Sequence, residues 1–350
     1  MLSVGLVGLP NAGKSTLFNL LTERSVPAEN FPFCTIDPHD GIVNVPDPRI
    51  DVLAKMVNAQ KKVYANIEFK DIAGLIKGAS TGAGLGNQFL SHIREVDLIL
   101  LIVRRFVNDD IIHVENRVNP LEDEEILLME LGIYDQNILE KQIQTLLKNK
   151  LKDSLYVSKN KVCEELLKRI DGKPNTAKDI DEQLAKEVEY TKWRKSLNLL
   201  TDKTIVRLGN ISSDGQNVDY ECDFELDIKA ESELAGMSQD ERIEFGYESE
   251  TGLDKLIRHC FYKLNLGTYL TCGEIEARAW TFKKNMKAPQ CAGVIHTDFE
   301  KKFIKAEVIS YQDFVELGGR KACVEVGKMR MEGKEYEVKD GDVIEFKIGG

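Results

Sequence analysis

The sequence lacks several features that mark special classes of protein. No run of about 18 apolar residues is present, so a membrane-spanning helix is not expected. The seven cysteines are scattered, odd in number and never spaced Cys-x-x-Cys, which argues against a zinc site and for reduced thiols. The chain enters an apolar segment without a basic leader, so secretion is not expected either. These absences favour a cytoplasmic protein with no membrane partner.

What remains is the composition of an ordinary globular protein. Its 350 residues (39.5 kDa) include 42% hydrophobic and 30% charged side chains, which is enough for two or three folded units. The net charge of -11 argues against a general nucleic-acid binder. Residues 278–305, however, hold seven basic residues against two acidic ones, which could mark a surface for an anionic partner. A solvated face with ordinary lysines explains this pattern equally well.

Three regions with different patterns of apolar residues follow one another along the chain. Up to residue 133, apolar runs alternate with helical stretches, which predicts an α/β domain with a mostly parallel sheet. Residues 134–200 carry apolar side chains at helical spacing, and a break at 171–175 predicts two long helices in an antiparallel hairpin. Strand and helix character return over 201–271, so the hairpin interrupts the α/β domain. Residues 272–350 predict a small α+β or mostly β domain.

Individual strands are expected where short apolar runs lie between turn residues. The expected strands are 2–8, 66–74, 96–103, 204–210, 224–230, 276–282, 291–299, 303–310 and 342–348. A helix is expected near 251–264.

Residues 8–16, Gly-Leu-Pro-Asn-Ala-Gly-Lys-Ser-Thr, match the P-loop pattern G-x-x-x-x-G-K-[ST]. The backbone N–H groups of such a loop point into one concavity at a helix N-terminus, where the helix dipole favours phosphate. Lys14 is expected to reach the β- and γ-phosphates and to contribute to catalysis. The residues expected to bind the nucleotide here are Gly8, Asn11, Ala12, Gly13, Lys14, Ser15 and Thr16.

Two further segments predict a magnesium ion beside the phosphates. Asp71 ends an expected strand as Asp-Ile-Ala-Gly and is predicted to hold Mg²⁺ through water, while Gly74 donates its backbone N–H to the γ-phosphate. The hydroxyls of Ser15 and Thr35 are the expected direct ligands, Thr35 only when a γ-phosphate is bound. This set predicts a nucleoside triphosphatase that acts as a switch. A glycine loop that only caps a helix is the structural alternative.

The residue that usually orients the attacking water is absent from its place. Ras-like enzymes carry a glutamine directly after D-x-x-G. Leu75 stands there and cannot hydrogen-bond to water, so we expect slow hydrolysis or another group that aligns the nucleophile.

Several segments together resemble one family, the Obg-like ATPases of the YchF type. They are residues 8–22, 30–51, 71–97, 108–114, 287–314 and 327–347. The resemblance implies a P-loop domain (1–133 and 201–271), an inserted helical hairpin (134–200) and a C-terminal TGS domain of β-grasp fold (272–350). It also implies hydrolysis of ATP in preference to GTP, association with the ribosome, and a role in translation or stress responses. A hydrophobic residue at position 75 is typical of this family.

The resemblance suggests roles for two further residues. Family members carry a histidine in the loop of His113, which makes it the candidate for positioning or activating water. A lone histidine after two isoleucines is otherwise more often structural. Asn11 lies where potassium-activated relatives place a cation ligand, so K⁺ joins Mg²⁺ as a candidate cofactor; a turn-stabilising asparagine is the alternative.

The segment that would read the base is Asn210-Ile211-Ser212-Ser213. GTPases use N-K-x-D here, and the family usually carries N-x-x-E, whereas Ser213 leaves no carboxylate in register and Asp214 lies one residue too far. Guanine thus loses its charged acceptor, while adenine can be held by Asn210 and by backbone groups near Ile211. We therefore expect ATP to be preferred over GTP.

Three functions remain open on the sequence. The first is a slow ATPase switch on ribosomes, for which the predicted hairpin and the basic 278–305 face would bracket a groove for ribosomal RNA or transfer RNA. The second is an Obg-type GTPase in ribosome assembly, which Ser213 disfavours. The third is a nucleotide-gated docking module with incidental turnover. The expected oligomeric state is a monomer.

Overall fold

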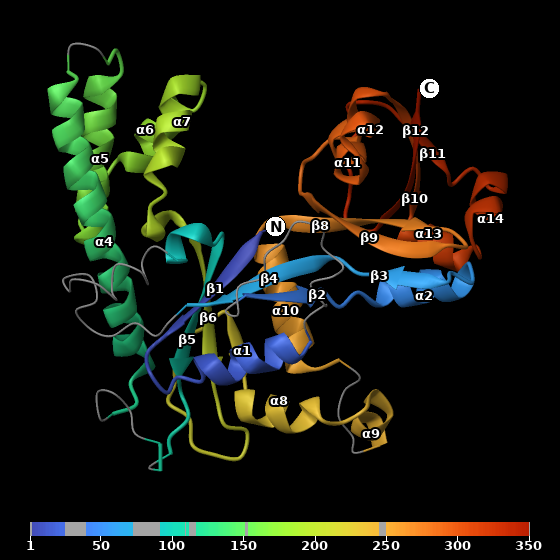
Figure 1. Ribbon diagram of the computed structural model, residues 1–350, viewed down its shortest axis with the longest axis horizontal. Coiled ribbons are helices and arrows are strands. Elements are labelled where there is room, and N and C mark those ends of the chain that lie inside the picture. The colour runs from blue at the N-terminus through green and yellow to red at the C-terminus, as the bar shows by residue number, and fades with distance from the viewer. Residues whose placement is uncertain are drawn as a thin grey trace. The chain divides into compact units, whose positions relative to one another are not determined.

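Figure 1 shows the computed structural model, which describes residues 2–24, 40–72, 92–108, 110–111, 117–150, 153–244 and 250–349. Four residues discussed above, Thr35, Gly74, Leu75 and His113, lie outside these ranges. The chain falls into two compact units. The P-loop unit comprises Ser3–Phe18 and Lys70–Glu233, and the C-terminal unit comprises Met1–Leu2, Asn19–Phe69 and Leu234–Gly350. None of the helices in the described ranges is long and apolar enough to cross a membrane.

A parallel sheet forms the centre of the P-loop unit. Its neighbouring strands are, in order, β1 (Ser3–Gly8), β5 (Leu98–Arg104), β6 (Thr204–Asn210) and β7 (Phe224–Leu226), all parallel. Both β1 and β5 are buried along their whole length, which explains their continuous apolar sequence. The register pairs Arg104 with Asn210 and Asn210 with Leu226, so the carboxyl ends of these strands meet at one edge. The predicted mostly parallel sheet is confirmed.

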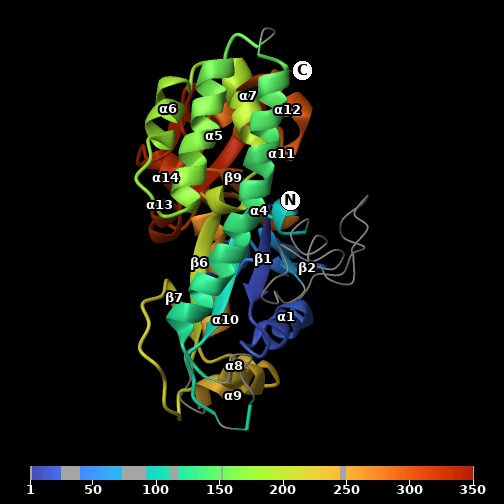
Figure 2. The same ribbon diagram turned by 90° about the vertical axis from the view of Figure 1, so that its left-hand side faces the viewer.

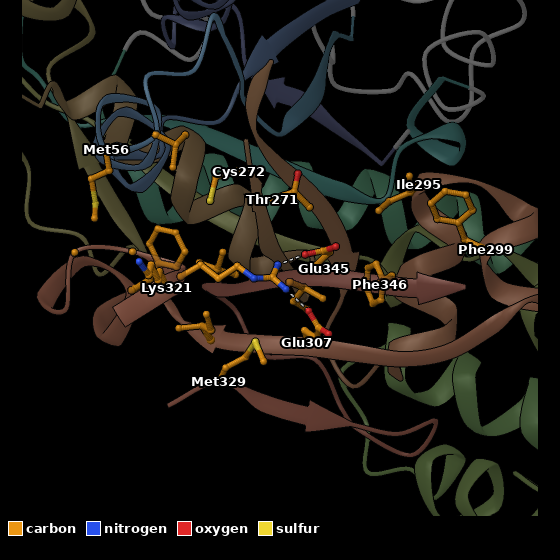
Figure 3. Close-up of a pocket in the computed structure, with 18 residues that line it drawn as sticks. Met56, Thr271, Cys272, Ile295, Phe299, Glu307, Lys321, Met329, Glu345 and Phe346 are labelled. Carbon is orange, nitrogen blue, oxygen red and sulfur yellow. Dashed lines mark hydrogen bonds and ion pairs between the residues drawn. The ribbon is translucent and has the colours of Figure 1, made fainter. Parts of the chain in front are cut away.

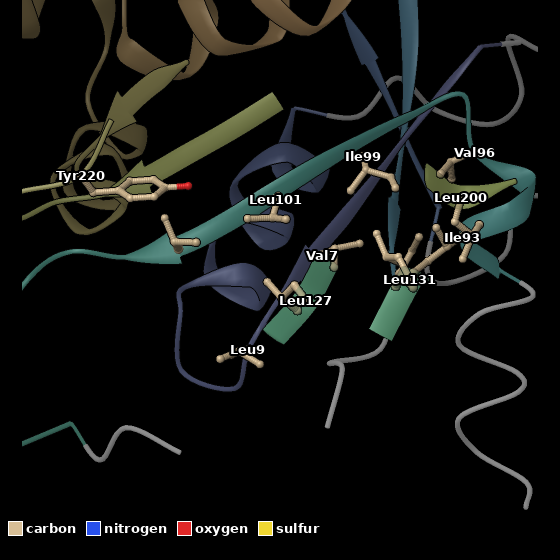
Figure 4. Close-up of a cluster of buried hydrophobic side chains, with 12 residues drawn as sticks. Val7, Leu9, Ile93, Val96, Ile99, Leu101, Leu127, Leu131, Leu200 and Tyr220 are labelled. Carbon is tan, nitrogen blue, oxygen red and sulfur yellow. The ribbon is translucent and has the colours of Figure 1, made fainter. Parts of the chain in front are cut away.

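One face of this sheet packs against a long helix. Figure 4 shows the cluster, in which Val7 of β1 and Leu101 of β5 meet Leu127 and Leu131 of α4 (Pro120–Lys148). All four side chains are fully buried. Burying each contributes roughly 1.5–3 kcal/mol to folding. This packing fixes the sheet edge at which the predicted site residues lie.

The helical region differs from the predicted pair of long helices. Helix α4 runs without a break across the predicted boundary at 133/134, because apolar residues at helical spacing continue from Leu131 to Leu139 and Leu146. Helix α5 (Tyr156–Ile170) lies beside it, as Figure 2 shows. The predicted turn at 171–175 is found, but it leads into two short helices, α6 (Ala177–Gln183) and α7 (Val188–Leu197).

The break between α4 and α5 was not predicted and has local polar causes. Asn149 ends α4, its N–H donating to the carbonyls of Thr145 and Leu146. Asp153 then accepts the Leu155 N–H at 2.9 Å and pairs with Lys159, a buried lysine that also pairs with Glu189. These bonds stabilise the turn and tie α5 to α7.

A buried carboxylate holds the segment that leads from the helices back to the sheet. Asp135 of α4 is fully buried and accepts the N–H groups of Leu200 at 2.9 Å and Thr201 at 2.8 Å. These residues belong to a short 3-10 helix, η2 (Leu200–Asp202), that precedes β6. Burial raises the pKa of Asp135.

The C-terminal unit contains a mixed sheet of β-grasp type. Its strands, in order across the sheet, are β11 (Arg330–Glu332), β10 (Phe303–Ser310), β12 (Asp342–Ile348), β8 (Leu266–Cys272), β9 (Glu276–Lys283) and β3 (Lys61–Val63). The first and last strands of the grasp, β8 and β12, run parallel at its centre, and their neighbours β9 and β10 run antiparallel to them. The predicted β-grasp is confirmed.

Three details of this sheet differ from the predictions. Strand β8 belongs to it, so the sheet begins at Leu266 rather than after residue 272. Strand β3, from far earlier in the chain, extends it by pairing parallel to β9. The strand predicted at 291–299 is wrong: the chain forms α11 (Ala288–Ile295) and α12 (Thr297–Lys301), because Pro289 opens a helix whose buried residues recur at helical spacing.

The C-terminal unit has further described elements outside this sheet. They are β2 (Asp40–Asn44), α2 (Pro48–Met56), α9 (Gln239–Glu244), α10 (Gly252–Lys263), α13 (Tyr311–Glu316) and α14 (Arg320–Glu325). Helix α10, predicted near 251–264, starts with a capping box between Thr251 and Asp254. Arg49 of α2 holds the loop before β12 by pairing with Asp340 at 2.9 Å.

Candidate nucleotide-binding site

The predicted P-loop connects β1 to α1 (Lys14–Glu23). Asn11 and Gly13 have left-handed backbones, with φ of 64° and 103°. Gly13 is also required by space, because a Cβ there would overlap the Asn210 amide. A Cβ on Gly8 would lie 2.8 Å from the Ile102 carbonyl oxygen of β5. The two glycines that define the motif are therefore demanded by the backbone geometry.

Lys14 and Asp71 form an ion pair at this end of the sheet. Lys14 is the first residue of α1, and Asp71 is the last residue of β4 (Asn66–Asp71). Their side chains are only 10% and 19% exposed. The two residues that the sequence predicted for phosphate and for magnesium thus lie in contact, with their opposite charges paired where little water reaches them.

The oxygen atoms near this pair suit magnesium. Ser15 follows Lys14 on the exposed first turn of α1, and Asp71 supplies a carboxylate. Magnesium prefers oxygen ligands and keeps several waters when phosphate is present, so it needs few protein groups. Among the residues that the structure describes, no group of three or more His, Cys, Asp or Glu side chains could hold a metal by itself. The donor set therefore fits an ion shared with a nucleotide.

Asn210 links the P-loop to the segment predicted to read the base. It ends β6 and is 5% exposed. Its Nδ2 donates to the Ala12 carbonyl oxygen at 2.9 Å, across 198 residues of sequence, and its Oδ1 accepts the Ile228 N–H at 3.4 Å. The side chain therefore holds the P-loop against the start of α8 (Ile228–Ala235).

One cavity of about 450 Å³ is lined by Asn11, Gly13 and Thr16 of the predicted phosphate segment and by Asn210 and Ile211 of the predicted base segment. The other described residues predicted for phosphate or magnesium do not line it: Gly8, Ala12, Lys14, Ser15 and Asp71. The volume of the cavity lies in the range of about 300–1,000 Å³ that is usual for small-molecule sites. All its lining residues belong to the P-loop unit, and they come from the P-loop and α1 (Asn11, Gly13, Thr16), the end of β5 (Phe106, Val107, Asn108, Ile111), the end of β6 (Asn210, Ile211, Ser212) and the start of α8 (Asp227, Ile228, Lys229, Ser232).

A buried arginine shapes the wall that follows β5. Arg104 is 1% exposed, and its guanidinium donates to the carbonyl oxygens of Phe106 at 3.1 Å, Asn108 at 2.9 Å and Ile111 at 2.9 Å. Burial lowers the pKa of Arg104. Arg104 was not among the residues predicted from the sequence. The available signal was an arginine at the end of a fully apolar strand, since a buried charge needs several partners.

Ser213 makes a contact that the sequence did not predict. Ser213 does not line the cavity; its N–H donates to Asp227 Oδ2 at 2.7 Å. The strand predicted over 224–230 ends at Leu226, and Asp227 instead begins α8 by accepting the Ala230 N–H at 3.0 Å. The cavity therefore has a carboxylate after all, supplied by a residue that was taken for part of a strand. An aspartate before a helical pattern was the signal for a cap.

The predicted backbone contact near Ile211 is also altered. The Ile211 N–H donates to the Leu226 carbonyl oxygen at 3.0 Å, and the Ser212 N–H donates to Asn217 Oδ1 at 2.8 Å. Both donors are used inside the protein. Adenine would have to be recognised here through acceptor atoms rather than through these N–H groups.

Comparison with known proteins gives matches over the whole chain. The chain is 45% identical over 371 residues to the ribosome-binding ATPase YchF of Bacillus subtilis, covering 99% of each protein. It is 37% identical over 380 residues to Obg-like ATPase 1 of Oryza sativa, covering 99% of this chain and 92% of that protein. The solved structure of the Schizosaccharomyces pombe YchF GTPase matches with a TM-score of 0.80 at 36% identity, covering 99% and 97% of the two chains.

The chain belongs to the YchF family. Two family models agree with this: YchF-GTPase_C, described as a protein of unknown function, matches residues 266–349, and MMR_HSR1, described as a 50S ribosome-binding GTPase, matches residues 3–150. The resemblance and the fold class predicted from the sequence are confirmed. So is the assignment to P-loop nucleoside triphosphatases, an activity that the matched relatives carry in their names.

A second cavity, of about 550 Å³, lies in the C-terminal unit of this YchF protein. Figure 3 shows that apolar side chains such as Phe299 and Phe346 line it together with Glu307 and Glu345. Arg320 pairs with both of these carboxylates. No residue predicted for nucleotide binding lines this cavity, so the smaller cavity of the P-loop unit is the candidate nucleotide site.

Proposed function

We propose that this chain is a magnesium-dependent ATPase that acts as a nucleotide switch and associates with the ribosome. The observation that carries the proposal is the single cavity shared by Asn11, Gly13 and Thr16 of the P-loop and by Asn210 and Ile211 of the base segment. Phosphate and base of one nucleotide can then be held by segments that are about two hundred residues apart in the chain.

Different groups at the phosphate end would bind the phosphates and the magnesium ion. Backbone N–H groups of the loop from Gly8 to Thr16 would cradle the phosphates, and Lys14 would exchange its partner Asp71 for the β- and γ-phosphates. The N–H of Ala12, which was also predicted to bind the nucleotide, donates to the Leu9 carbonyl oxygen at 3.2 Å. The Ser15 hydroxyl and, through water, Asp71 would hold Mg²⁺, which would supply positive charge beside the phosphates. The roles of Thr35 as a ligand, of Gly74 as a γ-phosphate donor and of His113 in activating water stay predictions, as does K⁺ at Asn11.

The names of the matched proteins indicate two different nucleotides. The curated relatives are named ATPases, whereas the matching structure is named a GTPase. Ser213 gives guanine no carboxylate in register, and this supports ATP. An Obg-type GTPase is the alternative, and a direct comparison of the two nucleotides decides between them.

Ribosome association rests on the names of the relatives and on charge. The Bacillus subtilis relative is named a ribosome-binding ATPase. In this chain Lys301 and Lys302 are exposed and Lys305 is half-buried, at the end of α12 and on β10. These lysines of the predicted TGS domain are suited to contact ribosomal RNA through its phosphates.

Hydrolysis measured with and without ribosomes tests the proposal. We expect slow ATP turnover that requires Mg²⁺ and changes when ribosomes are added. If the rate of ATP turnover does not change when ribosomes are added, but binding to ribosomes depends on the nucleotide, the docking-module alternative is favoured. Replacing Lys301, Lys302 and Lys305 together by glutamate is expected to abolish co-sedimentation with ribosomes at low salt while intrinsic turnover persists. Unchanged co-sedimentation would remove this surface from the proposal.

A further inference from the structure

The backbone donors around the base end of the cavity are directed at other protein atoms. The N–H groups of six lining residues donate to protein carbonyl or amide oxygens at 2.8–3.4 Å: Phe106, Val107, Ile111, Ile211, Ser212 and Ile228. A carbonyl group on a ligand therefore does not find a backbone partner at these positions. In the interior of a site, an acceptor that loses its hydrogen bonds to water without replacement weakens binding.

Asp227 is the centre of this arrangement. Its Oδ2 accepts the Ser213 N–H at 2.7 Å and its Oδ1 accepts the Ala230 N–H at 3.0 Å. The Lys229 N–H and the Ser213 hydroxyl add to these bonds. Burial acts to raise the pKa of Asp227, but the bonds from Ala230 and Ser213 lower it below its ordinary value. The group is therefore a carboxylate at neutral pH, fixed from two segments and partly exposed to the cavity.

We propose that Asp227 makes this cavity selective for a purine with an amino group at C6, by gathering the nearby backbone donors and presenting a negatively charged acceptor in their place. The inference rests on the proposed function and deepens it. Adenine carries an amine at C6, which is a donor, whereas guanine carries a carbonyl there, which is an acceptor. The carboxylate attracts the first and repels the second.

The same arrangement weakens the other edge of guanine. Guanine also offers the N1–H and an amine at C2, which GTPases receive on a carboxylate at the position of Ser213. In this chain Ser213 donates both its N–H and its hydroxyl to Asp227. Both oxygens of Asp227 already hold backbone N–H groups, which leaves them less able to accept a further pair of donors side by side.

Binding of four purine triphosphates to the wild-type chain tests the inference without a substitution. Equilibrium titrations in Mg²⁺ would compare ATP and 2,6-diaminopurine triphosphate, which carry an amine at C6, with GTP and inosine triphosphate, which carry a carbonyl there. We expect the first two to bind at least about tenfold more tightly than the last two, whatever stands at C2. Grouping by the C2 substituent instead would overturn the inference.

Substitution of Asp227 gives the second arm. Asp227→Asn and Asp227→Ser both keep an oxygen that can cap α8 but remove the charge and release backbone donors. Each is expected to reduce the preference for ATP over GTP by about tenfold. The matched control is Asp214→Asn, which removes an exposed charge from the same loop but does not line the cavity.

The outcomes separate this inference from the proposed function. If the wild type binds ATP and both Asp227 variants keep its full preference, the inference is overturned and the ATPase proposal stands. If the wild type binds neither ATP nor GTP, the proposed function itself fails. The thermal midpoint of each variant shows whether it is folded, and if neither variant folds, the four-nucleotide comparison decides alone.

Discussion

The two ends of the candidate nucleotide cavity are built in different ways. The phosphate end is local: Asn11, Gly13 and Thr16 line the cavity from one loop and the helix that follows it, and Asn11 and Gly13 have left-handed backbones. The base end is assembled from the ends of β5 and β6 and the start of α8, which are held together by side chains such as Asn210 and Asp227. A short motif can specify the first, whereas the second depends on contacts between distant segments.

This difference explains why the P-loop could be predicted from sequence and the arrangement of the base end could not. In the P-loop, the glycines have a conformational reason that is independent of the rest of the chain. At the base end, the same carboxylate function can be supplied by residue 213 or by a residue on a neighbouring segment. Four substitutions test whether the two ends depend on different contacts, and the first is expected to have the largest effect.

Lys14→Met should abolish catalysis at the phosphate end. The substitution keeps a long side chain but removes the charge that faces the phosphates and leaves Asp71 without its partner. We expect the rate of ATP hydrolysis to fall by at least about 10²–10³-fold. Lys192→Met, an exposed lysine of α7, is the matched control and should hydrolyse ATP like the wild type. Normal turnover by the Lys14 variant would remove this residue from the mechanism.

Asn210→Ala should damage both ends at once. It leaves the Ala12 carbonyl without its buried donor and the Ile228 N–H without its acceptor. We expect the dissociation constants of ATP and GTP to rise together by about 10–100-fold, with their ratio unchanged. Asn175→Ala, at an exposed asparagine of the helical region, serves as the control. A change in the ratio alone would mean that Asn210 reads the base rather than connecting the segments.

Asp71→Asn should affect magnesium more than nucleotide. The amide still accepts a hydrogen bond from Lys14 but attracts a metal-bound water less strongly. We expect the Mg²⁺ concentration for half-maximal hydrolysis to rise about tenfold, the low end of losses caused by removing a partner of a metal shell. Asp51→Asn, an exposed carboxylate that pairs with Lys62 at 2.5 Å, is the control. An unchanged Mg²⁺ requirement would contradict the role of Asp71.

Ser213→Asp should have the smallest effect, although it restores the carboxylate of a GTPase motif. The backbone N–H at this position remains bonded to Asp227, and the new charge lies beside an existing one of the same sign. Like charges this close weaken each other as acceptors, so GTP affinity is expected to improve by less than about fivefold. If the variant instead prefers GTP, the motif position governs the base and the network around Asp227 does not.

The sequence predicted most of the fold because most of its elements are encoded locally. The continuous apolar runs of β1 and β5 indicated buried strands, and the helix expected near 251–264 is α10. The break at 149–155 was missed because the apolar spacing continues past it. The helix at 288–295 was taken for a strand because Cys291 and Ala292 begin a short apolar run that could suit either structure.

The missed parts of the site have a common physical cause. Arg104 and Asp227 act through partners supplied by the fold: three loop carbonyls in the first case, and the N–H groups of Ser213 and Ala230 in the second. Strand β3 similarly gains its place from a partner strand more than two hundred residues later. Local pattern does not contain these partners, so the sequence predicted no carboxylate at the base segment, although Asp227 lines the cavity.

The central claim is that this YchF protein binds a nucleotide across the P-loop and the α8 segment and prefers adenine. Parallel titrations of the wild-type chain with non-hydrolysable ATP and GTP analogues in Mg²⁺ test it most directly. We expect the ATP analogue to bind at least about tenfold more tightly. Equal or tighter binding of the GTP analogue would contradict it.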